Sequence, residues 1–83
     1  MDKIDGLRQQ IDSLDDRIMK LLDARFDLTT EIGRLKSLNN INVTNQNRET
    51  YITNKTADYG HFPSIKEVYS TIFIESKKLQ NKG

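Results

Sequence analysis

The chain has 83 residues, the length of one small domain, and its 13 lysines and arginines against 12 aspartates and glutamates give a formal charge of +1. This balance argues against a nucleic-acid-binding protein, because such proteins carry a clear excess of basic residues. The sequence has no cysteine, no signal-peptide pattern and no apolar run long enough for a membrane span, so we expect a cytoplasmic protein without disulfides and without a membrane partner.

The first predicted element is one long helix over residues 3–38. Its apolar residues recur in alternating steps of three and four, which is heptad spacing. These seam residues are Ile4, Leu7, Ile11, Leu14, Ile18, Leu21, Leu28, Ile32 and Leu35. Such a helix is roughly 50 Å long, whereas a compact domain of this size has a radius of gyration of about 12 Å. One protomer cannot cover the seam, so we expect a two-fold homodimer.

Arg25 interrupts this seam at a heptad position. A buried guanidinium without an anion is costly, so Arg25 needs a permanent anionic partner, access to water, or an anionic ligand from outside. A polar residue at one seam position can also serve only to fix the register of a coiled coil. Lys36 stands close to the same direction around the helix, three turns later, so the two cations can hold a small anion between them.

Arg8 lies about 25 Å from Arg25 along the same helix and on another face. It cannot reach the same anion within one chain. If two long helices pack antiparallel about a two-fold axis, the start of one lies beside the later half of the other. Arg8 of the partner subunit then enters the site.

A short second helix is predicted over residues 45–58. Asn45 at its start can accept hydrogen bonds from the free amides of the first turn. Arg48 and Glu49 follow in that turn and are either site residues or surface charges that suit the start of a helix.

A third helix of medium length is predicted over residues 64–80, because Ser64 and Glu67 have the spacing of a capping box. Its apolar face continues through Ser76 and Gln80, whose polar side chains then point inward and need partners there. The predicted fold class is therefore all-α, with three helices in a single domain over residues 1–83.

The sequence offers no residue set for a metal site or for covalent catalysis. His61 is the only histidine and stands in a turn flanked by Gly60 and Pro63, with no cysteine or second histidine to complete a zinc site. A phosphate-binding glycine loop and a nucleophile with a neighbouring base are also missing.

Taken together, the pattern resembles the all-helical chorismate mutases. The likeness covers nearly the whole chain: Leu7-Arg8 to Ile11-Asp12, Leu14-Asp15, Leu21-Leu22 to Ala24-Arg25, Ile32-Gly33 to Lys36, Val43 to Arg48-Glu49, and Ser76 to Gln80. The resemblance implies an intertwined homodimer with two equivalent active sites, each with one arginine from the partner chain. It also implies the cofactor-free rearrangement of chorismate, a dianion, to prephenate in phenylalanine and tyrosine biosynthesis.

The resemblance gives four residues to the carboxylates of the substrate. Arg25 would bind one carboxylate, and Arg8 of the partner subunit would bind the other. Arg48 would support the carboxylate end, and Ser76 would add a hydrogen bond to the ring carboxylate. Guanidinium groups suit this task because they bind a carboxylate through two parallel hydrogen bonds.

The resemblance gives the remaining residues to the reacting ether and the ring hydroxyl. Lys36 and Gln80 would donate to the ether oxygen as it gains negative charge, and are the predicted catalytic residues. Glu49 would accept from the hydroxyl. Asn45 stands where many relatives have an aspartate beside the hydroxyl, and we expect it to alter affinity modestly. Because Gln80 is neutral, unlike the glutamate of some relatives, activity should persist at neutral and mildly alkaline pH.

Two other functions fit the sequence. Isochorismate pyruvate lyase has a similar fold and uses similar cations to eliminate pyruvate. A non-catalytic helical dimerisation or regulatory module, in which Arg25 only sets the register, is a reading from a different class of protein. Relatives of this domain also occur fused to an aromatic-pathway synthase, so the chain fits a domain cut from such a fusion as well as a free enzyme.

Overall fold

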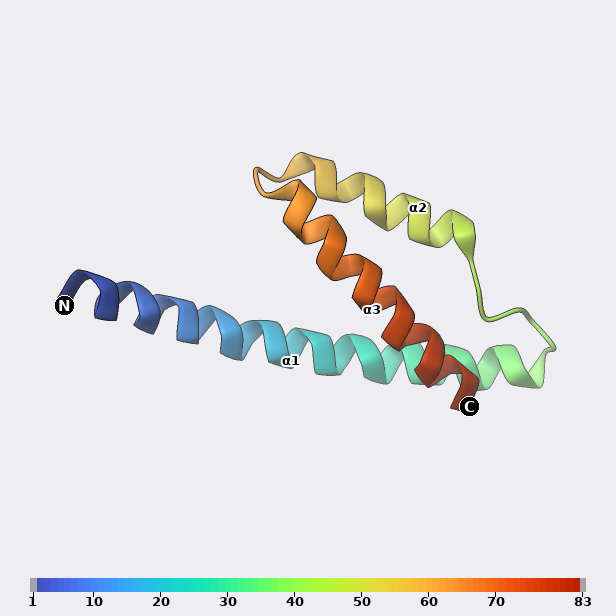
Figure 1. Ribbon diagram of the computed structural model, residues 1–83. Coiled ribbons are helices and arrows are strands. Elements are labelled where there is room, and N and C mark those ends of the chain that lie inside the picture. Colours follow the sequence, from blue (N-terminus) through green and yellow to red (C-terminus); the bar gives the residue numbers. More distant parts are fainter. Residues whose placement is uncertain (1, 83) are drawn as a thin grey trace.

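The computed structural model describes residues 2–82; Met1 and Gly83, which the predicted domain includes, lie outside the described residues. It consists of helix α1 (Asp2–Leu38), helix α2 (Gln46–Lys55), a short 3-10 helix η1 (Thr56–Asp58) and helix α3 (Phe62–Lys82) (Figure 1). Residues 2–82 contain no strand, so the predicted all-α fold class is confirmed. None of the described helices is long and apolar enough to cross a membrane.

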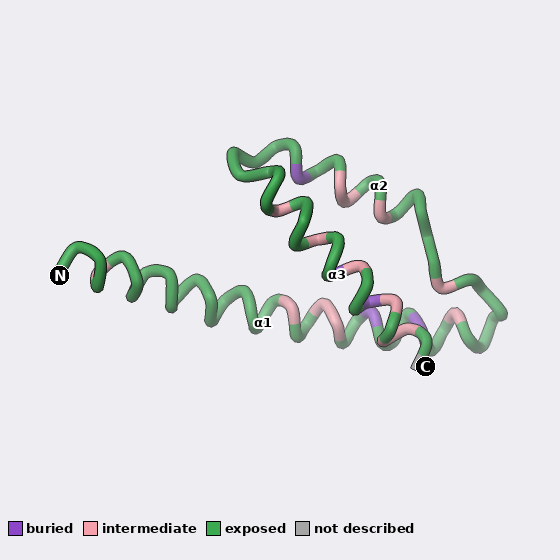
Figure 2. Tube along the Cα trace, in the orientation of Figure 1, coloured by how far each residue is buried: buried purple, intermediate pink, exposed green. Residues whose placement is uncertain are grey.

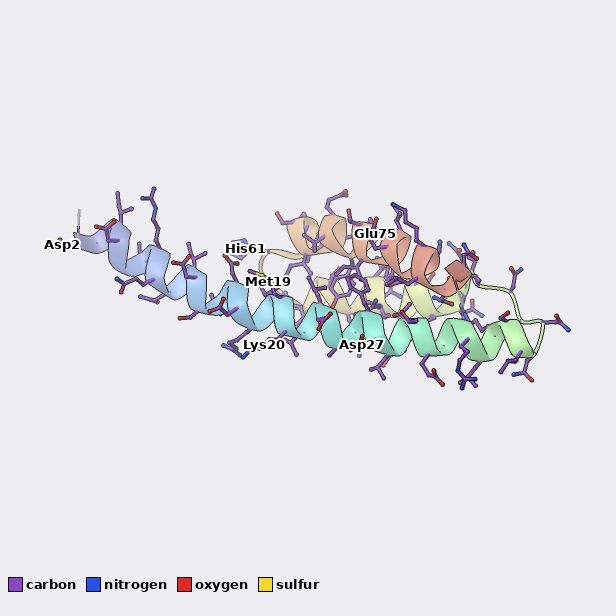
Figure 3. The ribbon with its side chains drawn as sticks, turned by 90° about the horizontal axis from the view of Figure 1, so that it is seen from below. Asp2, Met19, Lys20, Asp27, His61 and Glu75 are labelled. Atoms are coloured by element: carbon purple, nitrogen blue, oxygen red, sulfur yellow. The ribbon has the colours of Figure 1, made fainter. Side chains whose placement is uncertain are left out.

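The overall shape is elongated because α1 extends far beyond the other helices. In Figure 1 its first half projects away from α2 and α3, and in Figure 3 its side chains there point outward on all sides. The chain measures 56 × 23 × 14 Å with a radius of gyration of 16.1 Å. A compact domain of this length would have a radius of gyration of about 12 Å.

A left-handed backbone turn follows the end of α1 at Leu38, two residues after Lys36. Asn40 adopts a left-handed conformation with φ of 54°, which asparagine tolerates better than most residues. The amide of Ile41 donates to the Lys36 carbonyl at 2.8 Å and the amide of Asn40 donates to the Ser37 carbonyl at 3.4 Å. This Schellman-type closure keeps Lys36 in the last turn of α1 and directs the link, residues 39–45, back along the helix.

As predicted, Asn45 caps α2. Its Oδ1 accepts the backbone N–H of Arg48 at 3.0 Å, and its own backbone is extended. The helical path then tightens into η1, where Thr56 Oγ1 donates to the Thr53 carbonyl at 2.6 Å. The predicted second helix is therefore present as α2 followed by η1.

The predicted capping box of Ser64 and Glu67 is wrong, because α3 begins earlier, at Phe62. The amide of Ile65 donates to the His61 carbonyl at 3.0 Å, so Ser64 already lies inside the first turn. Pro63 explains the earlier start. Its ring fixes φ in the helical range, and its missing N–H falls among first-turn amides that have no partner within the helix.

Helix α3 joins the structure together by packing against the second half of α1 and against α2 and η1. At its crossing with α1 the backbones approach closely: a Cβ added to Gly33 would overlap the Gln80 backbone and lie 2.7 Å from its carbonyl oxygen. Ile72 is the one large apolar side chain among the described residues that is buried, and Thr29, Thr56 and Ser76 are buried polar residues (Figure 2).

The apolar seam of α1 is uncovered in the single chain. In its first half the seam residues are between 48% exposed, at Ile4, and 69% exposed, at Leu21. Large apolar side chains repeated along one helix face are costly to leave in water. Because the seam is uncovered, the described part of a single chain buries very few large apolar side chains.

Candidate active site

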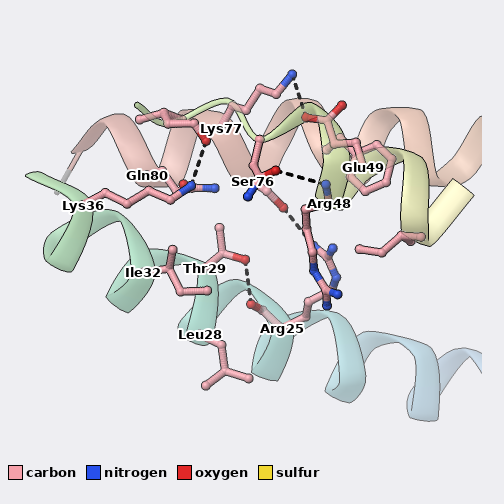
Figure 4. A pocket seen from close by; sticks show the side chains of 14 residues that line it. Arg25, Leu28, Thr29, Ile32, Lys36, Arg48, Glu49, Ser76, Lys77 and Gln80 are labelled. Atoms are coloured by element: carbon pink, nitrogen blue, oxygen red, sulfur yellow. Dashed lines mark hydrogen bonds and ion pairs between the residues drawn. The ribbon is translucent and has the colours of Figure 1, made fainter. Parts of the chain in front are cut away.

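One cavity of about 360 Å³ lies between the second half of α1, the link of residues 39–45, α2 and the end of α3 (Figure 4). Its polar and charged lining residues are Arg25, Thr29, Lys36, Asn45, Arg48, Glu49, Ser76, Lys77 and Gln80. Its apolar lining residues are Leu28, Ile32, Val43, Ile52 and Phe73. Every predicted site residue except Arg8 therefore lines the same cavity.

Arg25 enters the cavity from α1 and is held from two sides. Its Nη1 donates to Ser76 Oγ at 2.9 Å, and Ser76 itself is only 6% exposed. The guanidinium lies 6.0 Å from the ring centroid of Tyr69, within the range of a cation–π contact. These contacts are all with neutral groups, so the arginine is oriented without its charge being neutralised.

A second arginine reaches the same end of the cavity. Figure 4 shows Arg48 from α2 and Arg25 from α1 meeting there. The Arg48 guanidinium packs 5.3 Å from the ring centroid of Tyr51. Two guanidinium groups that share one end of a cavity repel each other unless an anion lies between them. This end is therefore suited to a carboxylate.

Lys36 and Gln80 lie at the opposite end of the cavity (Figure 4). Lys36 Nζ donates to the Val43 carbonyl at 3.0 Å, a contact that keeps the ammonium group directed toward the link. Gln80 Oε1 is buried and has no hydrogen-bond partner among the described residues. An amide in this state costs free energy until a ligand bonds to it, and a half-turn of the amide would present Nε2 as a donor instead.

Glu49 is the carboxylate of the cavity wall, and its partner is Lys77. Lys77 Nζ lies 3.0 Å from Glu49 Oε2, with the two side chains 35% and 22% exposed. Lys77 was not among the residues predicted from the sequence. Its position next to Ser76 and one turn before Gln80 was the available signal, because a residue three positions away lies on a neighbouring part of the helix surface.

Two more residues missed from the sequence support the predicted ones. Thr29 Oγ1 donates to the Arg25 carbonyl at 3.0 Å, one turn along α1. Val43 accepts the Lys36 ammonium group through its backbone carbonyl, a contact that no side-chain pattern can reveal. The Val43 carbonyl positions the Lys36 ammonium group, whereas the Thr29 hydroxyl bonds to the backbone of Arg25 within α1.

Arg8 lies outside the cavity, as its distance along α1 predicts. It is exposed on the first half of α1, which projects beyond the other helices of residues 2–82. Within residues 2–82, no group of three or more histidine, cysteine, aspartate or glutamate residues has the arrangement to hold a metal ion.

The formal charge of the cavity is strongly positive. Arg25, Lys36, Arg48 and Lys77 face a single carboxylate, that of Glu49. With cations at both ends and apolar walls between them, the cavity has the charge and the shape for a small organic dianion. It has hydrogen-bond donors at the end near Lys36 for a third, neutral oxygen.

Comparison with known proteins agrees with a cavity for a small organic dianion. Residues 7–81 match the family model described as chorismate mutase type II. Over 73 residues, 88% of this chain, the sequence is 34% identical to a bifunctional chorismate mutase/prephenate dehydratase of Aquifex aeolicus (strain VF5). The chain spans about a fifth of that relative, 19% of its length. The match reaches every cavity residue, and the chain belongs to the chorismate mutase type II family.

Proposed function

We propose that this chain catalyses the rearrangement of chorismate to prephenate for phenylalanine and tyrosine biosynthesis. The observation that carries the proposal is a cavity with arginines at one end and Lys36 with Gln80 at the other, within the residues that match the family. The likeness to one part of a bifunctional relative supports a domain that also works within a fused enzyme of the same pathway.

The proposed reaction makes simple chemical demands on the protein. In a pericyclic rearrangement the ether C–O bond breaks while a new C–C bond forms in the same molecule, so no proton, nucleophile or cofactor takes part. The protein has to hold a compact chair-like conformer and to stabilise the negative charge that develops on the ether oxygen.

One end of the cavity holds the substrate conformer, and the other end stabilises the charge on the ether oxygen. Arg25 binds one carboxylate through the guanidinium edge that Ser76 leaves free, and Arg48 supports the same end. Ser76 contacts the ring carboxylate through its hydroxyl, already 2.9 Å from Arg25 Nη1. These contacts are equal in the ground state and the transition state, so they act mainly on affinity and conformer.

Lys36 and Gln80 act on the transition state. Lys36 Nζ exchanges the Val43 carbonyl for the ether oxygen, and Gln80 turns its Nε2 toward the same atom. Charge grows on that oxygen as the C–O bond breaks, so both hydrogen bonds strengthen during the reaction. Glu49 and Asn45 serve the ring hydroxyl on the α2 side of the cavity.

The proposal includes an intertwined homodimer in which Arg8 of the partner subunit binds the second carboxylate. Two observations support it: the seam of α1 is at least 48% exposed at the large apolar residues from Ile4 to Leu21, and Arg8 lies in that same half of α1. A second α1 packed antiparallel along the seam covers these side chains and brings an arginine toward the cavity. The cytoplasmic location expected from the sequence remains part of this proposal, and cell fractionation tests it.

A chorismate-disappearance assay on the purified protein tests the proposal. Prephenate should form, and Lys36→Ala should lower kcat by orders of magnitude while the variant still folds. Isochorismate supplied in parallel would give pyruvate and salicylate if the protein were a lyase. A dimer that converts neither compound would identify a non-catalytic module, and equal turnover by Lys36→Ala would refute the mechanism.

A further inference from the structure

The ion pair between Lys77 on α3 and Glu49 on α2 closes one side of the cavity. The Lys77 Nζ to Glu49 Oε2 distance is 3.0 Å, and both side chains are mostly covered (Figure 4). Lys77 is the one cation of the cavity that has an anionic partner among the described residues: Arg25 bonds to Ser76, and Lys36 bonds to a carbonyl.

Glu49 creates an electrostatic difficulty for a site that takes a dianion. A carboxylate in the wall repels both carboxylates of the ligand, and this repulsion is stronger in a partly buried cavity than in water. The same carboxylate is useful as an acceptor for a hydroxyl. A cation that neutralises it without occupying both of its oxygens resolves the conflict.

We infer that Lys77 is a positioning residue for Glu49. It neutralises the carboxylate toward the dianion and, by contacting Oε2, orients the group so that Oε1 accepts the ligand hydroxyl. This inference rests on the proposed function, because it takes chorismate as the ligand. Lys77 acts through Glu49 and has no direct contact with substrate in this scheme.

Removal of Lys77 should therefore weaken substrate binding through Glu49 alone. In Lys77→Met, KM for chorismate should rise about tenfold, with kcat changed by less than about threefold, since the unpaired carboxylate opposes the dianion in ground state and transition state alike. Lys77→Arg keeps the charge and should return KM to within about threefold of the parent value. A merely structural role would not separate KM from kcat in this way.

A double-mutant cycle with Glu49→Gln isolates the path of the effect. In the Glu49→Gln background, Lys77→Met should change KM by less than about twofold, because no carboxylate remains to be neutralised. Lys78→Met is the matched control: Lys78 pairs with Glu75 at 2.9 Å outside the cavity, its side chain is 65% exposed, and KM should not change. Urea unfolding of each variant verifies that the fold is intact.

The outcomes separate this inference from the proposed function. The same tenfold rise in both backgrounds would mean that Lys77 binds substrate directly, and no rise in either would mean that it has no role in binding; each result overturns the inference while the mutase activity stands. If the parent protein binds chorismate without turnover, the proposed function fails, and the same cycle measured as Kd by calorimetry still decides the inference. If the parent protein does not bind chorismate, both fail.

Discussion

Gly33 sets the distance between α1 and α3 at the point where α3 delivers Gln80. A Cβ built on Gly33 would overlap the Gln80 Cα and lie 2.7 Å from the Gln80 carbonyl oxygen and 3.0 Å from its carbonyl carbon. These are backbone atoms of a helix, which cannot move aside as a flexible side chain can. Gly33→Ala should therefore push the end of α3 away from α1.

Two opposing terms give the size of the effect on stability. Alanine in place of an interior helical glycine gains about 1 kcal/mol through helix propensity. Forcing one extra carbon into a closed backbone contact costs about 1–3 kcal/mol. The free energy of unfolding of Gly33→Ala should thus be unchanged or lower by up to roughly 2 kcal/mol. Because the two terms can cancel, this one value does not reveal the cost of the contact.

Gly6 provides the control that isolates the contact. It also lies inside α1, but nothing comes within 4 Å of a Cβ built there, and it stands off the apolar seam. Gly6→Ala should stabilise the protein by about 1 kcal/mol. In urea unfolding, the difference between the two variants should then be about 1–3 kcal/mol, which is the cost of the contact itself.

The catalytic effect should exceed the effect on stability. A displacement of Gln80 by about 1 Å can cost on the order of 100-fold in rate, because the donor no longer meets the ether oxygen. We expect kcat of Gly33→Ala to fall by at least about tenfold and Gly6→Ala to keep the parent rate. If Gly33→Ala and Gly6→Ala were equally stable and equally active, the close approach of α1 and α3 would not control the site.

Four further experiments test the site and the assembly. Arg25→Leu should lose turnover by orders of magnitude without loss of unfolding free energy, because a carboxylate anchor, unlike a structural ion, is not needed by the empty fold; a stability loss with activity retained would contradict this. Gln80→Glu should be active only at low pH, because the introduced carboxyl donates to the ether oxygen only when protonated, so its rate falls as pH rises while the parent rate persists; a flat profile for the variant would count against the assignment. Mixing inactive Arg8 and Lys36 variants should restore part of the activity in mixed dimers, and no recovery despite subunit exchange would exclude a shared site. Leu14→Asp should shift the sedimentation velocity of the protein toward the monomer, since it places a charge in the seam, and an unchanged dimer would show that the seam is not the interface.

The helices were predictable where one local pattern dominates. The heptad spacing from Ile4 to Leu35 gives α1, and the side chain of Asn45 gives the start of α2. The start of α3 was not predictable in this way, because two signals compete there. Ser64 and Glu67 have the spacing of a capping box, whereas Pro63 suits the first turn of a helix, and α3 begins at Phe62, two residues before Ser64.

The cavity was predictable as a set of residue types, but its internal pairing was not. Arg25, Lys36, Ser76 and Gln80 share helix faces that periodicity reveals. The pairing of Lys77 with Glu49 depends on how α3 packs against α2, and a lysine on a helix is more often a solvated cation than a cavity residue. The role of Arg8 in a partner's site stays a prediction.

Helix α1 contributes to both the proposed dimer interface and the cavity. The first half of α1 carries an apolar seam that is at least 48% exposed at its large side chains, and the second half carries Arg25 and Lys36 on the same direction of the helix. Ile72 is the only large apolar residue that the described chain buries, so the packing that holds α3 over the cavity has little stability of its own. Burial of the seam in a dimer would then supply the free energy that keeps Arg25, Lys36 and Gln80 in place. Activity and helix content should therefore decline together on dilution, and helicity that persists in an inactive, dilute protein would show instead that the single chain holds its fold and that only the arginine of the partner is lost.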